Sequence, residues 1–459
     1  MTADVPTDDA TGRPTARWRS DRRVLAASLA WGGLCALAYA LLSLRRFARL
    51  EPTSWDNAIF EQAVQGYARL GAPIVDIKGP GFNILGDHFS PVTALLAPVY
   101  RIWPAAQTLL VAQAVLIGLS VVVVTALAVR TVGRWPGGVL GAAYGLSFGI
   151  QSAVRSDFHE VAFGAPLLAL AGAAFVERRW PAVAGWSLPL LLVKEDLGLT
   201  VAAVGVALWL AGARRRGLYL AALGVVWTAI VLVLVIPAFN PEGGYAYASS
   251  LGGDRGVVET LFTSLGTKLG TVALTVGVTG LAALWSPWVL VVLPTFAWRF
   301  AGDNAFYWGT DWHYSLLLMP VVFVAAVDAM RRRPVLRWAA VPAAVVTAVT
   351  LVGSPLSTLL ERQTWEASPR AATAERIQAT IPDGASVETD IGLITHLATD
   401  HRVYWIGTID GVRPEWVVLD HDANVGSPQD ALAYAQGKYG GTWRRVIDAD
   451  GYEVVKRTS

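Results

Sequence analysis

The sequence predicts an all-α polytopic membrane bundle with a small α/β domain at its C-terminal end. Of the 459 residues, 54% are hydrophobic and only 16% are charged, which is too apolar for a single soluble domain. The apolar residues recur as about eleven separate stretches, most of them near the length of a membrane helix. From residue 354 onward these stretches give way to short segments of alternating hydrophobicity, which are typical of strands.

The arginine residues predict the orientation of this bundle. They cluster in every second short connection, at Arg130, Arg134, Arg178, Arg179 and the triplets 214–216 and 331–333. Positive charge in short connections marks the cytoplasmic side of a membrane protein. We therefore expect a multi-pass plasma membrane protein with a cytoplasmic N-terminal tail, residues 1–23, and with its chemistry on the extracytoplasmic side.

The transmembrane domain is expected to cover residues 24–353. Its first span, 24–44, has full length and no clear cleavage site, so we interpret it as a retained signal anchor before an extracytoplasmic first loop, 45–90. Later spans are expected at 108–129, 136–153, 160–176, 181–193, 197–212, 217–237, 269–285, 288–298, 315–330 and 336–353. Several are shorter than the roughly 20 residues of a straight crossing, so they must be broken, tilted or set around a water-filled cavity.

Residues 354–459 are expected to form an extracytoplasmic α/β domain, because an odd number of spans follows a cytoplasmic N-terminus. Five segments are typical of strands, namely VETD, RVYWIG, EWVVLD, TWRRVID and YEVVK. Helices are expected near 365–380, 391–398 and 428–437.

The first loop contains a predicted amphipathic helix. Trp55 and Ile59 recur at helical spacing, while Asn57 and Glu61 share another face. A helix of this kind is expected to lie at the membrane surface.

Asp56 stands near the start of this helix and has two alternative roles. As a structural residue, it or Ser54 caps the helix. As a catalytic residue, a carboxylate at the mouth of the bundle acts as a general base toward an acceptor hydroxyl. The sequence alone does not decide between these roles.

Three adjacent ionisable residues, Lys194, Glu195 and Asp196, interrupt an otherwise apolar stretch. Charges at or near bilayer depth are costly unless they pair or line a hydrated cavity, so such residues indicate function by default. In a substrate site, Lys194 suits a phosphate or carboxylate, and the two acidic residues suit a hydroxyl, a proton or a metal. The structural alternative is a tight hairpin in which Lys194 neutralises one neighbouring carboxylate.

A second cluster lies at the extracytoplasmic turn before residue 160. Asp157 and Glu160 share a face if the turn is helical, where they either form a capping box or belong to a substrate site. His88, His159 and His313 also map to extracytoplasmic membrane edges. Each is either a satisfied interfacial side chain or a ligand, and together with carboxylates they are compatible with a divalent metal, although their wide separation makes the pattern unspecific.

The cysteine content and the positions of the basic residues exclude some kinds of site and partner. Cys35, the only cysteine, lies inside the first span, which excludes an internal disulfide and a cysteine-based metal site. The basic residues lie at membrane boundaries, where they would contact lipid headgroups, so nucleic acid is not implied as a partner.

Six motifs in order resemble a known family. They are WDNAIFEQ, DHFSPVTALLAPVYRIWP, FHEVAFGAPLLALA, LLLVKEDLGL, the His313 and Tyr314 pair of TDWHYS, and IPDGASV followed by THLATDHRVYW. Across almost the whole chain these motifs resemble the DUF2079 family of bacterial membrane proteins, which is similar to the GT-C superfamily of membrane glycosyltransferases. The resemblance implies a GT-C-like fold, a polyprenyl-phosphate-linked sugar donor and an acidic residue in the first loop, at Asp56. The adjacent acidic pair usual in that superfamily is absent here, because Asn57 follows Asp56.

Two function classes therefore remain. The first is a glycosyltransferase that moves a sugar from a polyprenyl-phosphate donor to an extracytoplasmic acceptor, with Asp56 as the base. The second is a non-enzymatic transporter or flippase, with residues 194–196 as a mid-membrane substrate or coupling site. Polar clusters at one membrane edge favour the transferase, since a transport pathway needs polar groups toward both faces.

The arginine pattern makes a direct prediction about topology. A reporter fused after Arg216 should lie in the cytoplasm, and a reporter fused after Ser459 should lie outside it. Protease added to intact spheroplasts checks the result independently, because it should cleave the Ser459 fusion and leave the Arg216 fusion intact. A cytoplasmic C-terminus would contradict the odd number of crossings.

Overall fold

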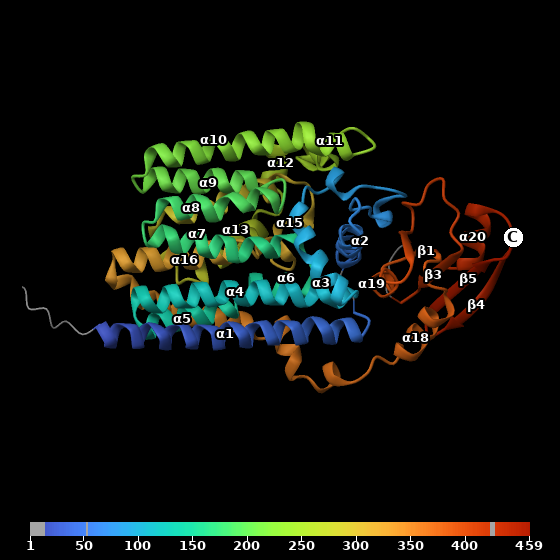
Figure 1. Cartoon of the computed structure of the whole chain (residues 1–459), viewed down its shortest axis with the longest axis horizontal. Coiled ribbons are helices and arrows are strands. Elements are labelled where there is room, and N and C mark those ends of the chain that lie inside the picture. Colours follow the sequence, from blue (N-terminus) through green and yellow to red (C-terminus); the bar gives the residue numbers. More distant parts are fainter. Residues whose placement is uncertain (1–13, 52–53, 423–426) are drawn as a thin grey trace, which may run out of the picture.

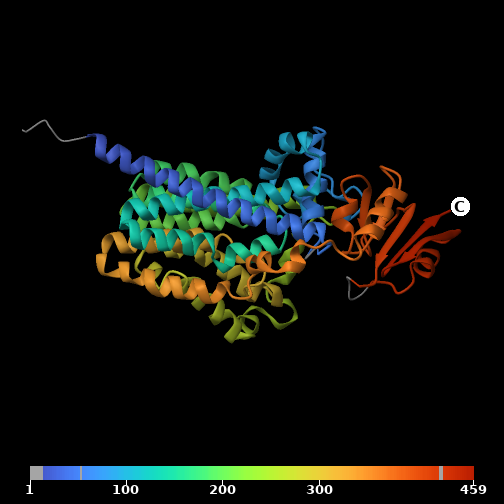
Figure 2. The ribbon, with the colours of Figure 1, turned by 90° about the horizontal axis from the view of Figure 1, so that it is seen from below.

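The computed structural model describes residues 14–51, 54–422 and 427–459. It contains a long helical bundle with an α/β domain at one end (Figures 1 and 2). Of the expected N-terminal tail, residues 1–13 lie outside the described residues, and α1 already begins at Pro14. The predicted division into a helical bundle and a small C-terminal sheet is confirmed.

The bundle is built from helices of very different lengths. They are α1 (Pro14–Ala48), α4 (Ala106–Val132), α5 (Arg134–Gly145), α6 (Phe148–Arg155), α7 (Gly164–Val176), α8 (Trp180–Ser187), α9 (Leu197–Leu210), α10 (Arg214–Ile230), α11 (Ile236–Phe239), α13 (Leu265–Gly277), α14 (Leu293–Ala301), α16 (Leu318–Arg332) and α17 (Ala340–Leu351). Shorter helices surround one end, namely α2 (Asp56–Ala68), α3 (Ala97–Ile102), α12 (Val257–Phe262) and α15 (Ala305–Trp308).

Eleven spans are not confirmed by these helices. Four helices are long and apolar enough to cross a membrane, at Arg22–Ala48, Ala106–Val132, Arg214–Phe239 and Pro334–Leu351, and one bent pair makes up to five. Several other expected spans coincide with apolar helices of only 10–17 residues, such as Trp180–Leu192 and Leu197–Leu210. Their shortness agrees with the expectation of broken segments, because the chain turns before a full crossing is made.

Small residues allow neighbouring helices to approach closely. A Cβ atom on Gly32 of α1 would lie 2.6 Å from the carbonyl oxygen of Gly118 in α4, and the reverse distance is 2.7 Å. Gly198 of α9 and Gly224 of α10 face one another in the same way. Such contacts matter in lipid, where packing rather than hydrophobic burial holds helices together.

The two ends of the bundle differ in chemistry. The arginine-bearing connections α4–α5, α7–α8, α9–α10 and α16–α17 lie at one end, which we call the basic end. Helices α2 and α3 and the C-terminal domain lie at the other, the domain end (Figure 1).

The C-terminal domain contains a five-stranded mixed sheet. Its strands are β1 (Ser386–Thr389), β2 (Arg402–Trp405), β3 (Trp416–Asp420), β4 (Trp443–Ala449) and β5 (Tyr452–Arg457), in the order β2-β1-β3-β5-β4. Strand β1 pairs in parallel with β2 and β3, and β5 pairs antiparallel with β3 and β4. The domain helices are α18 (Ala371–Thr380), α19 (Ile394–Leu397) and α20 (Ala431–Tyr439), close to the predicted positions.

Helix α2 lies between the bundle and this domain. On one face, Phe60 and Val64 pack with residues of α3 and α4. On another face, Ala58, Ile59 and Ala63 share a hydrophobic core with strands β1, β2, β3 and β5. The prediction that α2 lies at the membrane surface is therefore wrong, because its apolar face, with Ile59 and Ala63, packs on the C-terminal domain and not on lipid.

The exposed apolar surface at this end belongs to the following segment instead. In Pro91–Ile102, the side chains of Leu95, Val99 and Ile102 are exposed by 67%, 50% and 85%. Residues spaced by three or four positions share one side of a helix, so this segment presents an apolar ridge beside the bundle.

Polar contacts fix the domain on α2. Gln62 Nε2 donates a hydrogen bond of 2.9 Å to the carbonyl oxygen of Val403 in β2, while its Oε1 accepts from the Ile77 amide. Arg402 forms an ion pair of 2.6 Å with Asp76 in the loop after α2. The Gln62–Val403 and Arg402–Asp76 contacts join segments more than 300 residues apart.

Glu61 is buried in this interface without a cationic partner among the described residues. Its Oε1 accepts hydrogen bonds of 2.7 Å from the hydroxyl groups of Tyr100 and Thr399. Burial raises the pKa of Glu61 to about 7 from its ordinary 4.5, although the two hydroxyl bonds lower it and nearby Asp400 adds to the rise. The carboxyl group is therefore poised to be neutral when the domain is docked.

The buried Glu61 predicts a pH-dependent stability. Below pH 4.5 the group is protonated in both the folded and unfolded chain, whereas between pH 4.5 and 7 only the folded chain retains the proton. Stability should therefore fall as the pH rises through this window, by up to roughly 3 kcal/mol, and stay constant above it. Thermal unfolding of the detergent-purified protein against pH measures this.

Glu61→Gln is the matched control, because an amide is neutral at every pH in the window. The difference in stability between the wild-type and Glu61→Gln proteins should change with pH only within that window and stay constant on either side of it. An identical pH slope in both proteins would show that Glu61 does not titrate there.

Candidate functional site

Seven of the residues singled out from the sequence meet at the domain end of the bundle. They form what we call the polar cluster, consisting of Asp56, His88, His159, Glu160, Lys194, Glu195 and His313. Helix α2, the loop after it, the turn between α6 and α7, the turn before α9 and the loop before α16 each contribute to it.

Asp56 contacts a histidine and does not cap its helix. The Ser54 hydroxyl accepts the Asp56 backbone N–H at 3.3 Å, whereas no side-chain capping bond is formed by the residue before the helix. The Asp56 Oδ2 atom lies 3.4 Å from His159 Nε2. The imidazole of His159 in turn stacks on that of His313, with ring centroids 3.5 Å apart.

These neighbours keep Asp56 ionised. Burial alone would raise the pKa of the Asp56 carboxyl, but the charge and hydrogen bonding of His159 outweigh it, with help from Ser54 and His88, and lower the pKa to about 2. The side chain retains 29% exposure, so the carboxylate is both charged and accessible.

Lys194 pairs with a carboxylate from a different turn. Its Nζ lies 2.8 Å from Glu160 Oε1, and the side chains are exposed by only 14% and 1%. The structural alternative, in which Lys194 neutralises an adjacent acidic residue, is therefore wrong, because Lys194 pairs with Glu160 of another turn. The residue before the short 3-10 helix that begins at Glu160 is His159, and its side chain makes no capping bond.

Glu195 is held by the first loop. Its Oε1 lies 3.0 Å from His88 Nδ1, and its Oε2 accepts the Phe89 backbone N–H at 3.2 Å. Burial and the charge of Lys194 oppose protonation of His88, but Glu195 and Asp87 outweigh them, so the pKa of His88 is raised. The result is a second histidine and carboxylate pair beside the first.

Sequence reasoning missed several residues around this second pair. Lys78 forms an ion pair of 3.0 Å with Asp87, which also accepts a hydrogen bond from the Tyr247 hydroxyl at 3.4 Å. The Tyr247 ring stacks on His88, and the Tyr245 hydroxyl donates to Glu195 at 3.3 Å. The signal was available in the aromatic, glycine-rich stretch NPEGGYAYASS between two apolar stretches.

A small cavity joins the two halves of the cluster. It is lined by Lys194, Asp196, His313 and Tyr314, with apolar side chains that include Trp298. Asp196 thus faces the same cavity as His313, although 117 positions separate them in the sequence. At about 20 Å³ the cavity is small, and its charged and aromatic lining suits a single anionic or hydroxyl group.

Arg299 positions the loop that carries His313 and Tyr314. Its guanidinium donates to the carbonyl oxygens of Tyr307 and Gly309 and to the Ser315 hydroxyl. The side chain is fully buried, and the described residues provide no carboxylate ion pair for it. The loop conformation is therefore tied to a buried cation.

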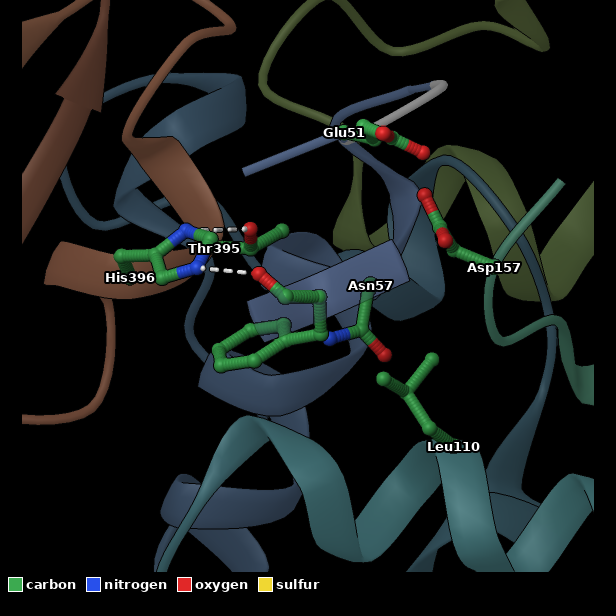
Figure 3. Close-up of a pocket in the computed structure, with 7 residues that line it drawn as sticks. Glu51, Asn57, Leu110, Asp157, Thr395 and His396 are labelled. Carbon is green, nitrogen blue, oxygen red and sulfur yellow. Dashed lines mark hydrogen bonds between the residues drawn. The ribbon is translucent and has the colours of Figure 1, made fainter. Parts of the chain in front are cut away.

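Asp157 lies in an adjoining pocket rather than in the polar cluster. Figure 3 shows its carboxyl group pointing toward Glu51, with Asn57, Thr395 and His396 around the same pocket. Asp157 has a left-handed backbone, with a φ of 65°. The side-chain atoms of Asn57 have no hydrogen-bond partner among the described residues, which leaves a donor and an acceptor facing this pocket.

The described residues contain no group of three or more His, Cys, Asp or Glu side chains arranged to hold a metal ion. The two histidine and carboxylate pairs, His88 with Glu195 and His159 with Asp56, are separate contacts.

One known protein family matches most of this chain. A family model described as a predicted membrane protein, DUF2079, matches residues 46–454 and so includes every residue of the polar cluster. The chain belongs to the DUF2079 family. Its description states a membrane location and names no reaction. A comparison with curated proteins finds no match.

In this DUF2079 protein, the ion pair between Lys194 and Glu160 predicts that substitutions of the two residues have non-additive effects on stability. Lys194→Ala should destabilise the protein by roughly 3 kcal/mol, because it leaves a buried carboxylate unpaired. Lys194→Ala with Glu160→Gln should cost less than the single change, as measured by thermal unfolding in detergent.

The matched control replaces the acidic neighbour instead. Lys194→Ala with Glu195→Gln should restore nothing, because Glu195 pairs with His88. Equal rescue by both double variants would mean that Lys194 has no preferred partner.

Proposed function

We propose that this protein is a membrane glycosyltransferase that moves a sugar from a polyprenyl-phosphate donor to an extracytoplasmic acceptor. The observation that carries the proposal is the ionised, partly exposed Asp56 carboxylate held against His159, beside the buried Lys194 and at one membrane edge of the bundle. The resemblance of the first-loop motif to GT-C enzymes supports the same role for Asp56.

The chemistry needs a base for the acceptor and a cationic site for the leaving phosphate. The acceptor oxygen forms a bond to the anomeric carbon as the bond from that carbon to the donor phosphate breaks. The bonding electron pair leaves with the phosphate oxygen, and the acceptor proton moves to the base. Asp56 takes this proton on its exposed oxygen, while His159 retains the orientation of the carboxylate.

A low pKa is compatible with this role. The acceptor hydroxyl becomes strongly acidic as its oxygen bonds to carbon, so a carboxylate is an adequate proton acceptor late in the reaction, as in glycoside hydrolysis. A pKa of about 2 keeps Asp56 ionised at any physiological pH. The negative charge also stabilises the positive charge that develops on the sugar.

Lys194 and His313 are the proposed contacts for the donor phosphate. Lys194 has three N–H donors and Glu160 occupies one of them, so two remain for phosphate oxygens. His313 lines the same cavity. Asp196, Tyr314, His88 and Glu195 are the proposed contacts for sugar hydroxyl groups. Glu160 holds Lys194 beside them, and Asp157 is proposed to contact substrate from the adjoining pocket.

Orientation is part of the proposal. With the basic end in the cytoplasm, the polar cluster and the C-terminal domain face the outside of the plasma membrane. The domain reaches the site through Trp405 at the end of β2, whose ring lies 4.8 Å from that of Trp55, the residue before Asp56. An acceptor therefore approaches along a surface that the domain helps to form.

The deciding experiment substitutes Asp56 with Asn. The amide retains the size of the side chain but takes no proton, so transfer from a polyprenyl-phosphate sugar should fall roughly a hundredfold or more. Folding should be unchanged, because Ser54 and not Asp56 accepts the backbone bond at the start of α2. Sugar transfer in reconstituted vesicles is the measurement.

Two controls make the result specific. Asp383→Asn, at an exposed position in the C-terminal domain, should retain activity. Ser54→Ala should lose about 1 kcal/mol of stability and retain most of the turnover. Full turnover by a well-folded Asp56→Asn protein would overturn the assignment, and movement of intact lipid-linked substrate by an inactive wild type would favour the flippase.

A further inference from the structure

A second built site lies at the basic end, far from the polar cluster. A pocket between α1, α4 and α5 is lined by Arg23, Ser28, Trp31, Thr125 and Arg134 together with small and apolar residues. Both arginine side chains are exposed, and the described residues provide no carboxylate ion pair for either. Two guanidinium groups thus converge on one pocket at a membrane boundary.

The interior of this pocket contains two buried hydroxyl groups without hydrogen-bond partners among the described residues. The hydroxyl groups of Ser28 and Thr125 are buried, with 1% and 8% exposure, and have no hydrogen-bond partner among the described residues. Serine and threonine in a helix commonly bond to their own backbone, and a buried hydroxyl without a partner is costly. Both hydroxyls line the pocket, so a ligand there offers them partners.

An apolar groove continues from this pocket along α1. Trp31 lines both cavities, and beyond it the groove is formed by Leu34, Cys35 and Ala38 of α1 with residues of α5 and of the 351–360 segment. From Arg23 to Tyr39 the helix rises about 24 Å, which exceeds the roughly 15 Å of one leaflet's hydrocarbon. A cationic pocket and an apolar groove that share Trp31 thus follow one another along α1.

We propose that this groove binds a membrane lipid with an anionic phosphate headgroup, its phosphate between Arg23 and Arg134 and its chain along α1 past Trp31. The two arginines supply charge-assisted hydrogen bonds to the phosphate oxygens. Ser28 and Thr125 bind the polar atoms that link the headgroup to the chain. Basic pockets between membrane helices are known sites for anionic lipids, and the proposal does not depend on the transferase function.

The test uses the full-length protein in detergent with defined lipids. Phosphatidylglycerol should raise the unfolding temperature, whereas phosphatidylcholine with the same chains should have a much smaller effect. Arg23→Ala with Arg134→Ala should weaken phosphatidylglycerol binding roughly tenfold or more, because two charged donors are lost. Arg215→Ala with Arg216→Ala removes the same charge at the same end and should leave the binding unchanged.

Two further measurements complete the test. One distinguishes binding of a lipid from binding of free phosphate, and the other distinguishes a change in folding stability from a change in lipid binding. Inorganic phosphate at the same concentration should give no stabilisation, since the apolar groove stays unused. Ser28→Ala should stabilise the lipid-free protein and yet reduce the lipid-induced shift. Equal effects of the two lipids, an unchanged response in the Arg23 and Arg134 double variant, or full stabilisation by inorganic phosphate would each overturn the proposal.

Discussion

The structure depends on one constraint, which is that charge next to a bilayer must be matched. The turn at residues 193–196 carries a lysine and two acidic residues between apolar helices. Each of these residues contacts a partner or a cavity from another part of the chain. Because an unpaired buried charge is costly, Glu160 is held beside Lys194 and His88 is held beside Glu195. The site geometry follows from this matching, because the same turns place His159 against Asp56.

A consequence of this matching is that contacts within the protein already hold the charges of the cluster, which suits the proposed transferase function. Catalytic electrostatics works best when charges are already in place and need no reorganisation. Here the first-loop helix, two inter-helix turns and the Arg299-anchored loop hold the charges from four directions. The cost of building such a site is spread over contacts that also hold the bundle together.

Much of the fold is visible in the sequence, because it follows from local patterns. All five strands of the C-terminal domain and most apolar segments lie where alternation and hydropathy predict them. The number of full crossings was not recoverable, since 3-10 turns at proline residues such as Pro189 and Pro287 break apolar stretches that look continuous. Hydropathy counts apolar residues and does not detect where the backbone bends.

The candidate site shows the same division. The sequence identified Asp56, Lys194 and the histidines as chemical groups, because charge in apolar surroundings is conspicuous. It did not identify partners, since Lys194 pairs across the bundle and not with its neighbour. Nor did it place α2, whose polar face is explained only by the domain that covers it.

The enclosure of α2 has a consequence for the order of events during synthesis. Gln62 and the Val403 carbonyl that it contacts are 341 positions apart. At the usual 5–20 residues per second, α2 leaves the ribosome roughly 20–70 s before its covering domain exists. During that interval its polar face meets water, which satisfies Glu61 and Gln62 until β2 arrives. The polar face of α2, which the complete structure buries against the domain, thus keeps the nascent helix hydrated until β2 is synthesised.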